Sequence, residues 1–239
     1  MERLDKFVSN QLCIGRTEAK RLIRIGKVAV DGNVEKNFGT HIDAEKSQIT
    51  IDGNKVNFKR NIYLLMNKPK GVVCSTDDKK SKTVIDLLPT EFKRKGISPV
   101  GRLDKDTTGL LILTDDGDFA HKVISPKHNT VKKYLVEVDG KFSDGIAERF
   151  EKGVILADGT RCMPAEIKII NNGGPFVCEV SIREGKYHQI KRMFGTENLG
   201  VNELKRLSIG NLKLPVESEL GDVRILSEEE KELVFVENR

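Results

Sequence analysis

Two short helices are predicted near the start of the chain by the spacing of its hydrophobic residues. The i, i+3, i+4, i+8 pattern of one helix face is formed by Leu4, Phe7, Val8 and Leu12. A second helix is predicted after Thr17, which can cap it, with an apolar stripe of Ala19, Leu22 and Ile23. Gly26 is expected to end this helix, because glycine takes the left-handed C-terminal position without a steric clash.

Short strands and tight turns are predicted to follow these helices. Val28-Ala29-Val30 is typical of a strand, and the Asp31-Gly32 pair after it is typical of a tight turn. A second strand is predicted at Ile49-Thr50-Ile51, before another Asp-Gly pair at 52–53. Residues 57–61 are the expected linker. We therefore predict a small domain at 1–60 and a larger domain at 61–239.

Strands and helices alternate through the larger domain. Strands are predicted at Ile62–Met66, Leu110–Thr114, Tyr134–Val138, Ala165–Ile170 and Phe176–Ile182, with a turn at 67–71 after the first. Helices are predicted at Phe119–Ile124 and Lys186–Phe194, and a capping box at Ser227-x-x-Glu230 opens a last helix. This mixed order with hairpin-like spacing favours an α+β fold with a mixed, mostly antiparallel sheet and flanking helices.

The composition indicates a soluble globular protein. Hydrophobic residues make up 38% of the chain and charged residues 32%. No apolar run is long enough to cross a bilayer, and the charged N-terminus has no signal-peptide core, so we expect a cytoplasmic protein. We also expect a monomer. The four cysteines are far apart, and the histidines do not flank them at zinc spacing, so no metal site is expected.

Positive charge is concentrated outside the C-terminal segment. Residues 216–239 contain three Lys/Arg and eight Asp/Glu, a local charge of −5, so the total of +5 leaves +10 on residues 1–215. A basic body of this kind favours a polyanionic partner, with nucleic acid first, although an ordinary solvated basic surface has the same composition.

The polar loop around Asp104 has the features of a reactive site. Asp104 is flanked by Arg102 and Lys105 and lies just before the strand predicted at Leu110–Thr114. Neighbouring cations favour the ionised carboxylate, and reactive groups are common in loops anchored by a rigid strand. An isolated loop aspartate is nevertheless more often a turn residue or a helix cap.

The first domain resembles the small RNA-binding domain named after ribosomal small-subunit protein S-four. The matching segments are RLDKFV, GRTEAKRLIRIGKVAVDG and ITIDG, which span nearly all of residues 1–55. The cationic face of the second helix can lie along a phosphate backbone. The RNA-binding candidates in this domain are Arg16, Lys20, Arg21, Arg24 and Lys27.

The larger domain resembles pseudouridine synthases of the RsuA group. Four ordered blocks over residues 62–230 carry the resemblance: LLMNKPKGVVCSTDD, GRLDKDTTGLLILTDDG, KKYLVEV and EGKYHQIKRMF. These enzymes break the bond between ribose and uracil, turn the base and rejoin it through a ring carbon. No redox step or group transfer is involved, so the resemblance implies no cofactor.

The resemblance assigns roles to five residues. Asp104 is implied as the carboxylate that starts the reaction, by addition to the sugar, addition to the base or removal of a sugar proton. Tyr134 offers a face for stacking on uracil and a phenol for proton transfer, and Lys191 can keep Asp104 ionised. Arg102 is implied to fill the gap that the flipped nucleotide leaves or to hold that nucleotide. Arg192 is a further candidate for RNA contact. Taken alone, Tyr134 fits an ordinary core aromatic better, and Lys191 and Arg192 fit a solvated helix face better.

Ribosomal RNA or a pre-ribosomal particle is the expected partner, with small-subunit RNA favoured by the CSTDD segment and the acidic C-terminus. One alternative is a sister enzyme that modifies large-subunit RNA. Another is a non-catalytic RNA-binding or ribosome-assembly protein, although this alternative gives no chemical reason for Asp104, Tyr134 and Lys191 to occur together.

Overall fold

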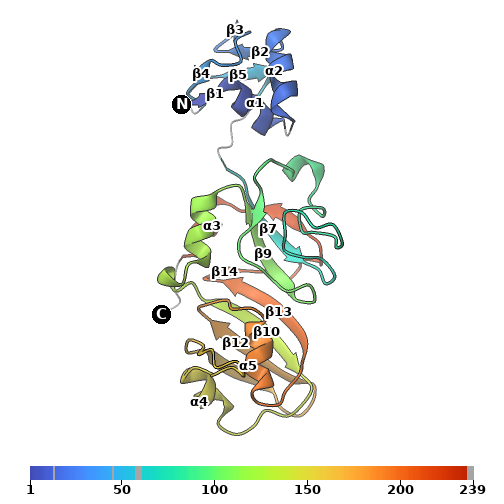
Figure 1. Ribbon diagram of the computed structural model, residues 1–239, viewed down its shortest axis with the longest axis vertical. Helices are drawn as coiled ribbons and strands as arrows, with labels where there is room; N and C mark the ends of the chain where they lie inside the picture. The colour runs from blue at the N-terminus through green and yellow to red at the C-terminus, as the bar shows by residue number, and fades with distance from the viewer. Residues whose placement is uncertain (13, 45, 57–60, 236–239) are drawn as a thin grey trace. The chain divides into compact units, whose positions relative to one another are not determined.

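The computed structural model describes residues 1–12, 14–44, 46–56 and 61–235, which form two compact units (Figure 1). One unit contains Met1–Ile62 together with Thr90–Gly96, and the other contains Tyr63–Pro89 together with Ile97–Arg239. Of the expected linker, only Asn61 lies within the described residues.

The first unit packs two helices against short strands. Its elements are β1 (Glu2–Arg3), α1 (Leu4–Gln11), α2 (Arg16–Arg24), β2 (Val28–Val30), β3 (Asn33–Val34), β4 (His41–Ile42), β5 (Ile49–Ile51) and β6 (Asn54–Lys55). Strands β3-β2-β5-β6 form one antiparallel sheet, and β1 pairs with β4. The predicted apolar helix faces form its core with Val28 and Ile49, except for Leu12, which lies after the end of α1 and is exposed.

Both ends of α2 can be compared with the sequence prediction. Gly26 has a φ of +80°, the left-handed conformation expected at the end of this helix. The prediction that Thr17 caps the start was wrong. The N-cap is Gly15, without a side-chain cap, and Thr17 lies inside the first turn.

A nine-stranded sheet forms the centre of the second unit. Its strands are β7 (Tyr63–Lys68), β8 (Ser98–Pro99), β9 (Thr108–Thr114), β10 (Lys132–Val138), β11 (Glu166–Asn171), β12 (Phe176–Ile182), β13 (Val201–Ile209), β14 (Leu212–Lys213) and β15 (Val223–Ile225). The main order is β11-β12-β10-β13-β9-β7-β15, with β14 beside β13 and β8 beside β9. The pairs are antiparallel except β9 with β13, which confirms the mixed, mostly antiparallel α+β prediction.

The parallel pairing of β9 with β13 depends on a glycine. Gly109 lies opposite Arg206 and has a φ of +101°. A Cβ atom at this position would lie 2.3 Å from the carbonyl oxygen of Arg206. Only glycine therefore allows the two backbones to approach so closely, which brings the loop before β9 next to β13.

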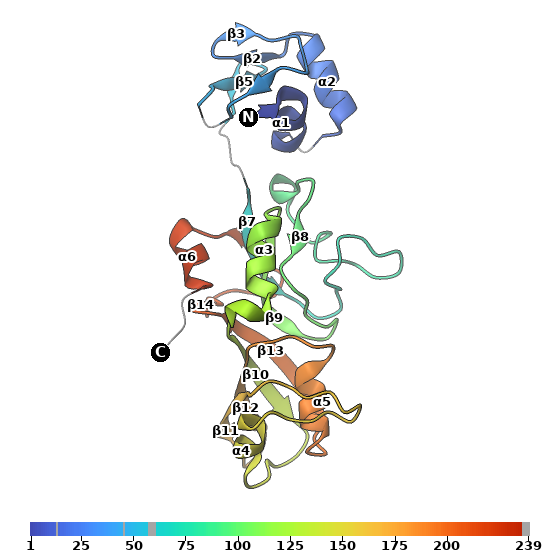
Figure 2. The same ribbon diagram turned by 60° about the vertical axis from the view of Figure 1, so that its left-hand side comes forward.

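Helices α3 (Gly117–Ile124), α4 (Ile146–Glu151), α5 (Gln189–Gly195) and α6 (Glu228–Leu233) accompany this sheet (Figure 2). Phe119 and Val123 of α3 pack against Leu110 and Ile112 of β9. Near the other end of the sheet, the ring of Phe194 in α5 lies 5.2 Å from that of Phe150 in α4. The capping box of Ser227 and Glu230 is confirmed at the start of α6.

Two boundaries near the candidate site differ from the prediction. β7 continues through Lys68, so the predicted turn at 67–71 starts later than expected. α5 begins at Gln189 instead of Lys186, because His188 has a φ of +47° that interrupts helical geometry before it.

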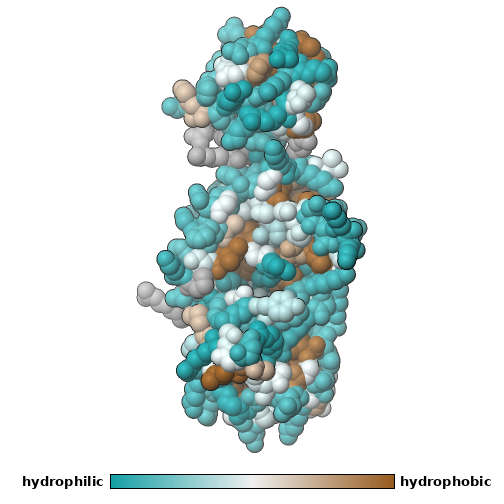
Figure 3. All heavy atoms as spheres, viewed as in Figure 1, coloured by the Kyte–Doolittle hydropathy of each residue, from teal (hydrophilic) through white to brown (hydrophobic). Residues whose placement is uncertain are grey.

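The surface visible in Figure 3 is mainly hydrophilic, with hydrophobic atoms confined to small patches. Within the described ranges, no helix has both the length and the apolar character that a membrane span requires.

Candidate active site

A buried lysine holds the loop that carries Asp104. Lys68, at the end of β7, is fully buried. Its ammonium group donates hydrogen bonds to the carbonyl oxygens of Asp104 at 3.0 Å, Thr107 at 2.9 Å and Pro69 at 3.0 Å. Backbone carbonyls thus satisfy the hydrogen-bond donors of the Lys68 ammonium group. These bonds hold the loop before β9 in place. Sequence reasoning placed this residue in a turn and missed its role.

The carboxylate of Asp104 is contacted from two sides. The Nε2 atom of His188 lies 3.5 Å from Oδ1, and the Nζ atom of Lys191 lies 3.7 Å from Oδ2. The Asp104 side chain is 27% exposed, so the carboxylate remains accessible from solvent. His188 and Lys191 therefore restrict the orientation of the Asp104 carboxylate but leave it accessible for reaction.

Lys191 contacts Asp106 more closely than Asp104. Its Nζ atom lies 2.5 and 2.6 Å from the two carboxylate oxygens of Asp106. Hydrogen bonding from Lys191 lowers the pKa of Asp106, against the opposing effect of burial. The expected pairing of Lys191 with Asp104 is thus a longer contact, and the lysine bridges two aspartates of one loop.

His188 gains its position from an uncommon backbone conformation. Its positive φ lies in the left-handed region, which non-glycine residues adopt at a cost. The imidazole stacks on Tyr187, with ring centroids 3.8 Å apart and an interplanar angle of 19°. No local sequence pattern indicates this backbone conformation or the position of His188 beside Asp104.

A cavity of about 750 Å³ opens beside Asp104. Volumes of this order accommodate small ligands. Four of the sequence-predicted residues line it, namely Arg102, Asp104, Tyr134 and Lys191. Tyr134 is largely buried, and its hydroxyl lies 3.5 Å from Nη1 of Arg206.

Arg192 does not join this group. Its guanidinium pairs with Asp158 and also donates to the carbonyl oxygen of Tyr187. Among the described residues that line the cavity, Lys191 is present and Arg192 is not. The two adjacent cations therefore have different surroundings, which the run of charges could not reveal.

Carboxylates partly neutralise the cationic face of α2. Arg16 and Lys20 lie 3.2 and 4.0 Å from the buried carboxylate of Asp5. In the same unit, Arg21 pairs with Glu18, and Lys27 pairs with Asp52. These ion pairs reduce the charge that the predicted cationic face can offer to a polyanion.

Arg24 differs from the other predicted cations of this helix. Its guanidinium carbon lies 4.9 Å from the ring centroid of Phe38, and Nζ of Lys20 lies 5.1 Å from the same centroid. Arg24 has no ion pair within the described part of the chain, which leaves its charge open to a ligand.

In the parts of the chain that the structure describes, no cluster of three or more His, Cys, Asp or Glu side chains could hold a metal ion. The described cysteines Cys74, Cys162 and Cys178 are free thiols.

Comparisons with known proteins agree with this geometry. Residues 62–196 match the family described as RNA pseudouridylate synthase, and residues 2–49 match the S4 domain. The chain is 40% identical over 233 residues to the Uncharacterized RNA pseudouridine synthase YtzG of Bacillus subtilis (strain 168), covering 97% of this chain and 98% of that protein.

It is also 40% identical over 232 residues to Ribosomal small subunit pseudouridine synthase A of Escherichia coli (strain K12), covering 95% and 97% of the two chains. A crystal structure of a pseudouridylate synthase superposes with a TM-score of 0.68 at 32% identity, over 98% of this chain and all of the other.

Proposed function

The chain belongs to the RNA pseudouridylate synthase family, and we propose that it isomerises a uridine of small-subunit ribosomal RNA to pseudouridine. The reaction class makes it an isomerase. The choice of small-subunit RNA is supported by the relative from Escherichia coli, whose name specifies that subunit.

The observation that carries the proposal is that Asp104 and Tyr134 line the same cavity. Asp104 is the proposed catalytic residue, and its carboxylate is held between His188 and Lys191. It starts the reaction by addition to the sugar, addition to the base or removal of a sugar proton, three routes that use the same accessible oxygen.

The remaining cavity residues receive supporting roles in this proposal. Tyr134 stacks on the uracil and takes part in proton transfer through its hydroxyl. Lys191 supplies positive charge to both aspartates of the loop. Arg102 is exposed at the cavity, where it can hold a nucleotide that has left its stack. Arg192 contributes at most to RNA contact outside the cavity.

We further propose that residues 1–60 bind RNA and that residues 61–239 perform the chemistry. The S4 and synthase matches at 2–49 and 62–196 support this division. Within the first domain, Arg24 is the leading phosphate contact, because it has no ion pair among the described residues. The other candidates bind more weakly because carboxylates engage them, namely Arg16, Lys20, Arg21 and Lys27. The proposed protein acts as a cytoplasmic monomer on ribosomal RNA or a pre-ribosomal particle.

Mapping pseudouridine in ribosomal RNA from cells with and without the gene tests this proposal. One small-subunit site is expected to disappear without the gene and to return when the wild-type protein, but not Asp104→Asn, is supplied. Loss of a large-subunit site instead would identify the sister enzyme. An unchanged map together with retained RNA binding would identify a non-catalytic assembly protein.

A further inference from the structure

Two buried cations line the cavity beside Tyr134. Lys132 precedes Tyr134 by two residues on β10, and Arg206 lies opposite Tyr134 on β13. Lys132 is 9% exposed and Arg206 is 3% exposed, and both side chains line the cavity that contains Asp104. Alternate residues of a strand point to the same face, so Lys132, Tyr134 and Arg206 share one face of the sheet.

Neither cation has a carboxylate partner among the described residues. The Nε atom of Arg206 donates to the carbonyl oxygen of Leu110 at 2.7 Å, and Nη1 lies 3.5 Å from the hydroxyl of Tyr134. Its Nη2 atom is buried without an acceptor. For Lys132, the structure shows no hydrogen bond or ion pair from the ammonium group to any described residue.

The acidic residues around the cavity are engaged elsewhere. Only Asp104 and Glu184 carry carboxylates among the described lining residues. Asp104 is contacted by His188 and Lys191, while Glu184 is bonded to Lys186, Gln189 and the backbone of Met163. Positive charge on Lys132 and Arg206 is therefore uncompensated in the free protein.

Burial of such charges costs free energy unless an anion or a strong acceptor joins them. Burial, followed by the positive charge of Arg206, lowers the pKa of Lys132 to about 8. A negatively charged oxygen atom would give Arg206 the acceptor that it lacks and would offset the repulsion between the two cations.

We propose that Lys132 and Arg206 bind the carbonyl oxygens of the target uracil and stabilise the negative charge that the base acquires during the reaction. This inference rests on the proposed function of Asp104 as the residue that starts the reaction. It adds two substrate-contacting residues to that site, and it assigns them to the base instead of the sugar.

The chemistry supplies the charge that this pair would bind. When the bond between C1′ and N1 breaks, its electron pair passes to the uracil ring and is shared by the two carbonyl oxygens. The ring carbon C5 then bonds to C1′ and loses its proton, while N1 gains one, so the atoms and electrons balance. Addition of Asp104 to the base also moves charge onto a carbonyl oxygen. All three routes therefore benefit from preorganised donors at the base.

A phosphate is the less suitable source of the oxygen. The sheet face beneath Tyr134 is buried, and a flipped base enters such a pocket while the phosphate backbone remains near the surface. Nη1 of Arg206 also lies 3.5 Å from the hydroxyl of Tyr134, and Tyr134 is the residue proposed to stack on the uracil. The pair is thus placed at the base.

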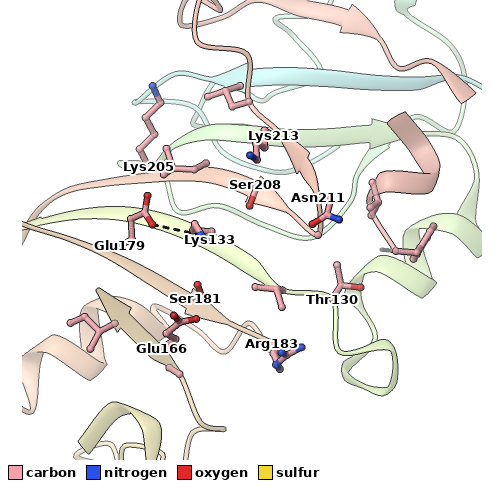
Figure 4. A pocket seen from close by; sticks show the side chains of 18 of the residues that line it. Thr130, Lys133, Glu166, Glu179, Ser181, Arg183, Lys205, Ser208, Asn211 and Lys213 are labelled. Carbon is pink, nitrogen blue, oxygen red and sulfur yellow. Dashed lines mark ion pairs between the residues drawn. The ribbon is translucent and has the colours of Figure 1, made fainter. Parts of the chain in front are cut away.

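The neighbouring Lys133 provides a matched control. It points to the other face of the sheet, into a separate hollow of about 950 Å³ (Figure 4). Its Nζ atom lies 3.6 Å from Glu179, so its charge has a partner. Lys132→Met and Lys133→Met therefore remove the same charge from the same strand on opposite faces.

The test compares single-turnover rates, RNA dissociation constants over a range of salt concentrations, and melting temperatures for Lys132→Met, Lys132→Arg and Lys133→Met. Lys132→Met is expected to slow the reaction about 100-fold, the usual effect of one lost oxyanion donor. Its RNA affinity should stay within threefold of wild type, its melting temperature should not fall, and Lys132→Arg should recover part of the rate.

Three results would overturn the inference. A Lys132→Met rate within threefold of Lys133→Met would exclude a role at the base. Weaker RNA binding with a reduced salt dependence would make Lys132 a phosphate contact, and a lower melting temperature with a matching loss of rate would make it structural. Asp104→Asn, assayed alongside, separates the two proposals: if it remains active, the assignment of Asp104 fails whatever Lys132→Met shows.

Discussion

The ammonium group of Lys68 lies 3.0 Å from the carbonyl oxygen of Asp104, 36 residues further along the chain. A fully buried lysine thus holds the backbone of the proposed catalytic residue, while the Asp104 carboxylate points toward His188 and Lys191. Lys68 thus holds the main chain of Asp104, while the carboxylate stays 27% exposed.

Lys68→Met is expected to lower both stability and activity. It keeps roughly the length of the side chain but removes the donor from the backbone carbonyls that Lys68 contacts, at a cost of about 3 kcal/mol. Chemical denaturation and single-turnover rates measure the two effects. Lys70→Met is the control, because Lys70 is half-exposed and pairs with Glu203. If Lys68→Met and Lys70→Met lost equal stability and equal activity, Lys68 would have no special role in positioning the loop.

Asp104→Asn is expected to abolish pseudouridine formation while RNA affinity stays within about tenfold, or about 1.4 kcal/mol. The substitution removes a reactive carboxylate from a basic surface and leaves the phosphate contacts in place. Product analysis and filter binding on the same RNA check both parts. Turnover near the wild-type rate would show that another group starts the reaction.

Tyr134→Phe and Tyr134→Ala should separate stacking from proton transfer. Tyr134→Phe retains the ring, so binding should persist while the rate falls about 100- to 10,000-fold through loss of the acid–base group. Tyr134→Ala should lose a further ~1–3 kcal/mol of base stacking.

Single-turnover rates and thermal melts distinguish these roles from a core role. Tyr134 is 7% exposed, so some loss of stability is expected in Tyr134→Ala. Full activity in Tyr134→Phe would remove the proton-transfer role. A large stability loss in Tyr134→Ala with normal binding would make the residue an ordinary core aromatic.

Neutralising Arg16, Lys20, Arg21 and Arg24 together should weaken RNA binding and reduce its salt dependence. Each lost phosphate contact lowers the slope of log K against log salt by about 0.7 to 0.9. Arg24→Ala alone should account for more of this change than Arg21→Ala, because Arg21 is paired with Glu18. An unchanged slope in the fourfold variant would show that α2 does not contact phosphates.

The pKa of Lys132 predicts a dependence of stability on pH. Its folded-state value of about 8 lies below the ordinary value of 10.5, so the unfolded chain binds more protons between these pH values. The free energy of unfolding should therefore rise with pH in that window, relative to Lys132→Met, and the difference between the two should be flat below pH 8. Urea melts at several pH values give the free energy of unfolding of both proteins. If the wild-type value decreased relative to that of Lys132→Met as the pH rises from 8 to 10, the lowered pKa of Lys132 would be contradicted.

Local sequence patterns determined most of the elements of this protein. The strand predicted at Phe176–Ile182 matches β12 to the residue, and the strand predicted at Tyr134–Val138 lies within β10, where burial alternates and Tyr134 is on the buried face. The same alternation puts Lys132 on that face, where an apolar residue is expected, and this anomaly was a signal that sequence reasoning did not use. Such patterns depend on residues that are close together in sequence, so they can be recognised without a structure.

Only the tertiary structure decided which groups meet. Arg206 reaches the carbonyl oxygen of Leu110, 96 residues away in sequence, because β13 runs parallel to β9 at Gly109. Lys191 of α5 meets Asp106, 85 residues away in sequence, more closely than it meets Asp104. No local pattern specifies strand partners or loop approach over such separations, since these depend on the packing of the whole sheet.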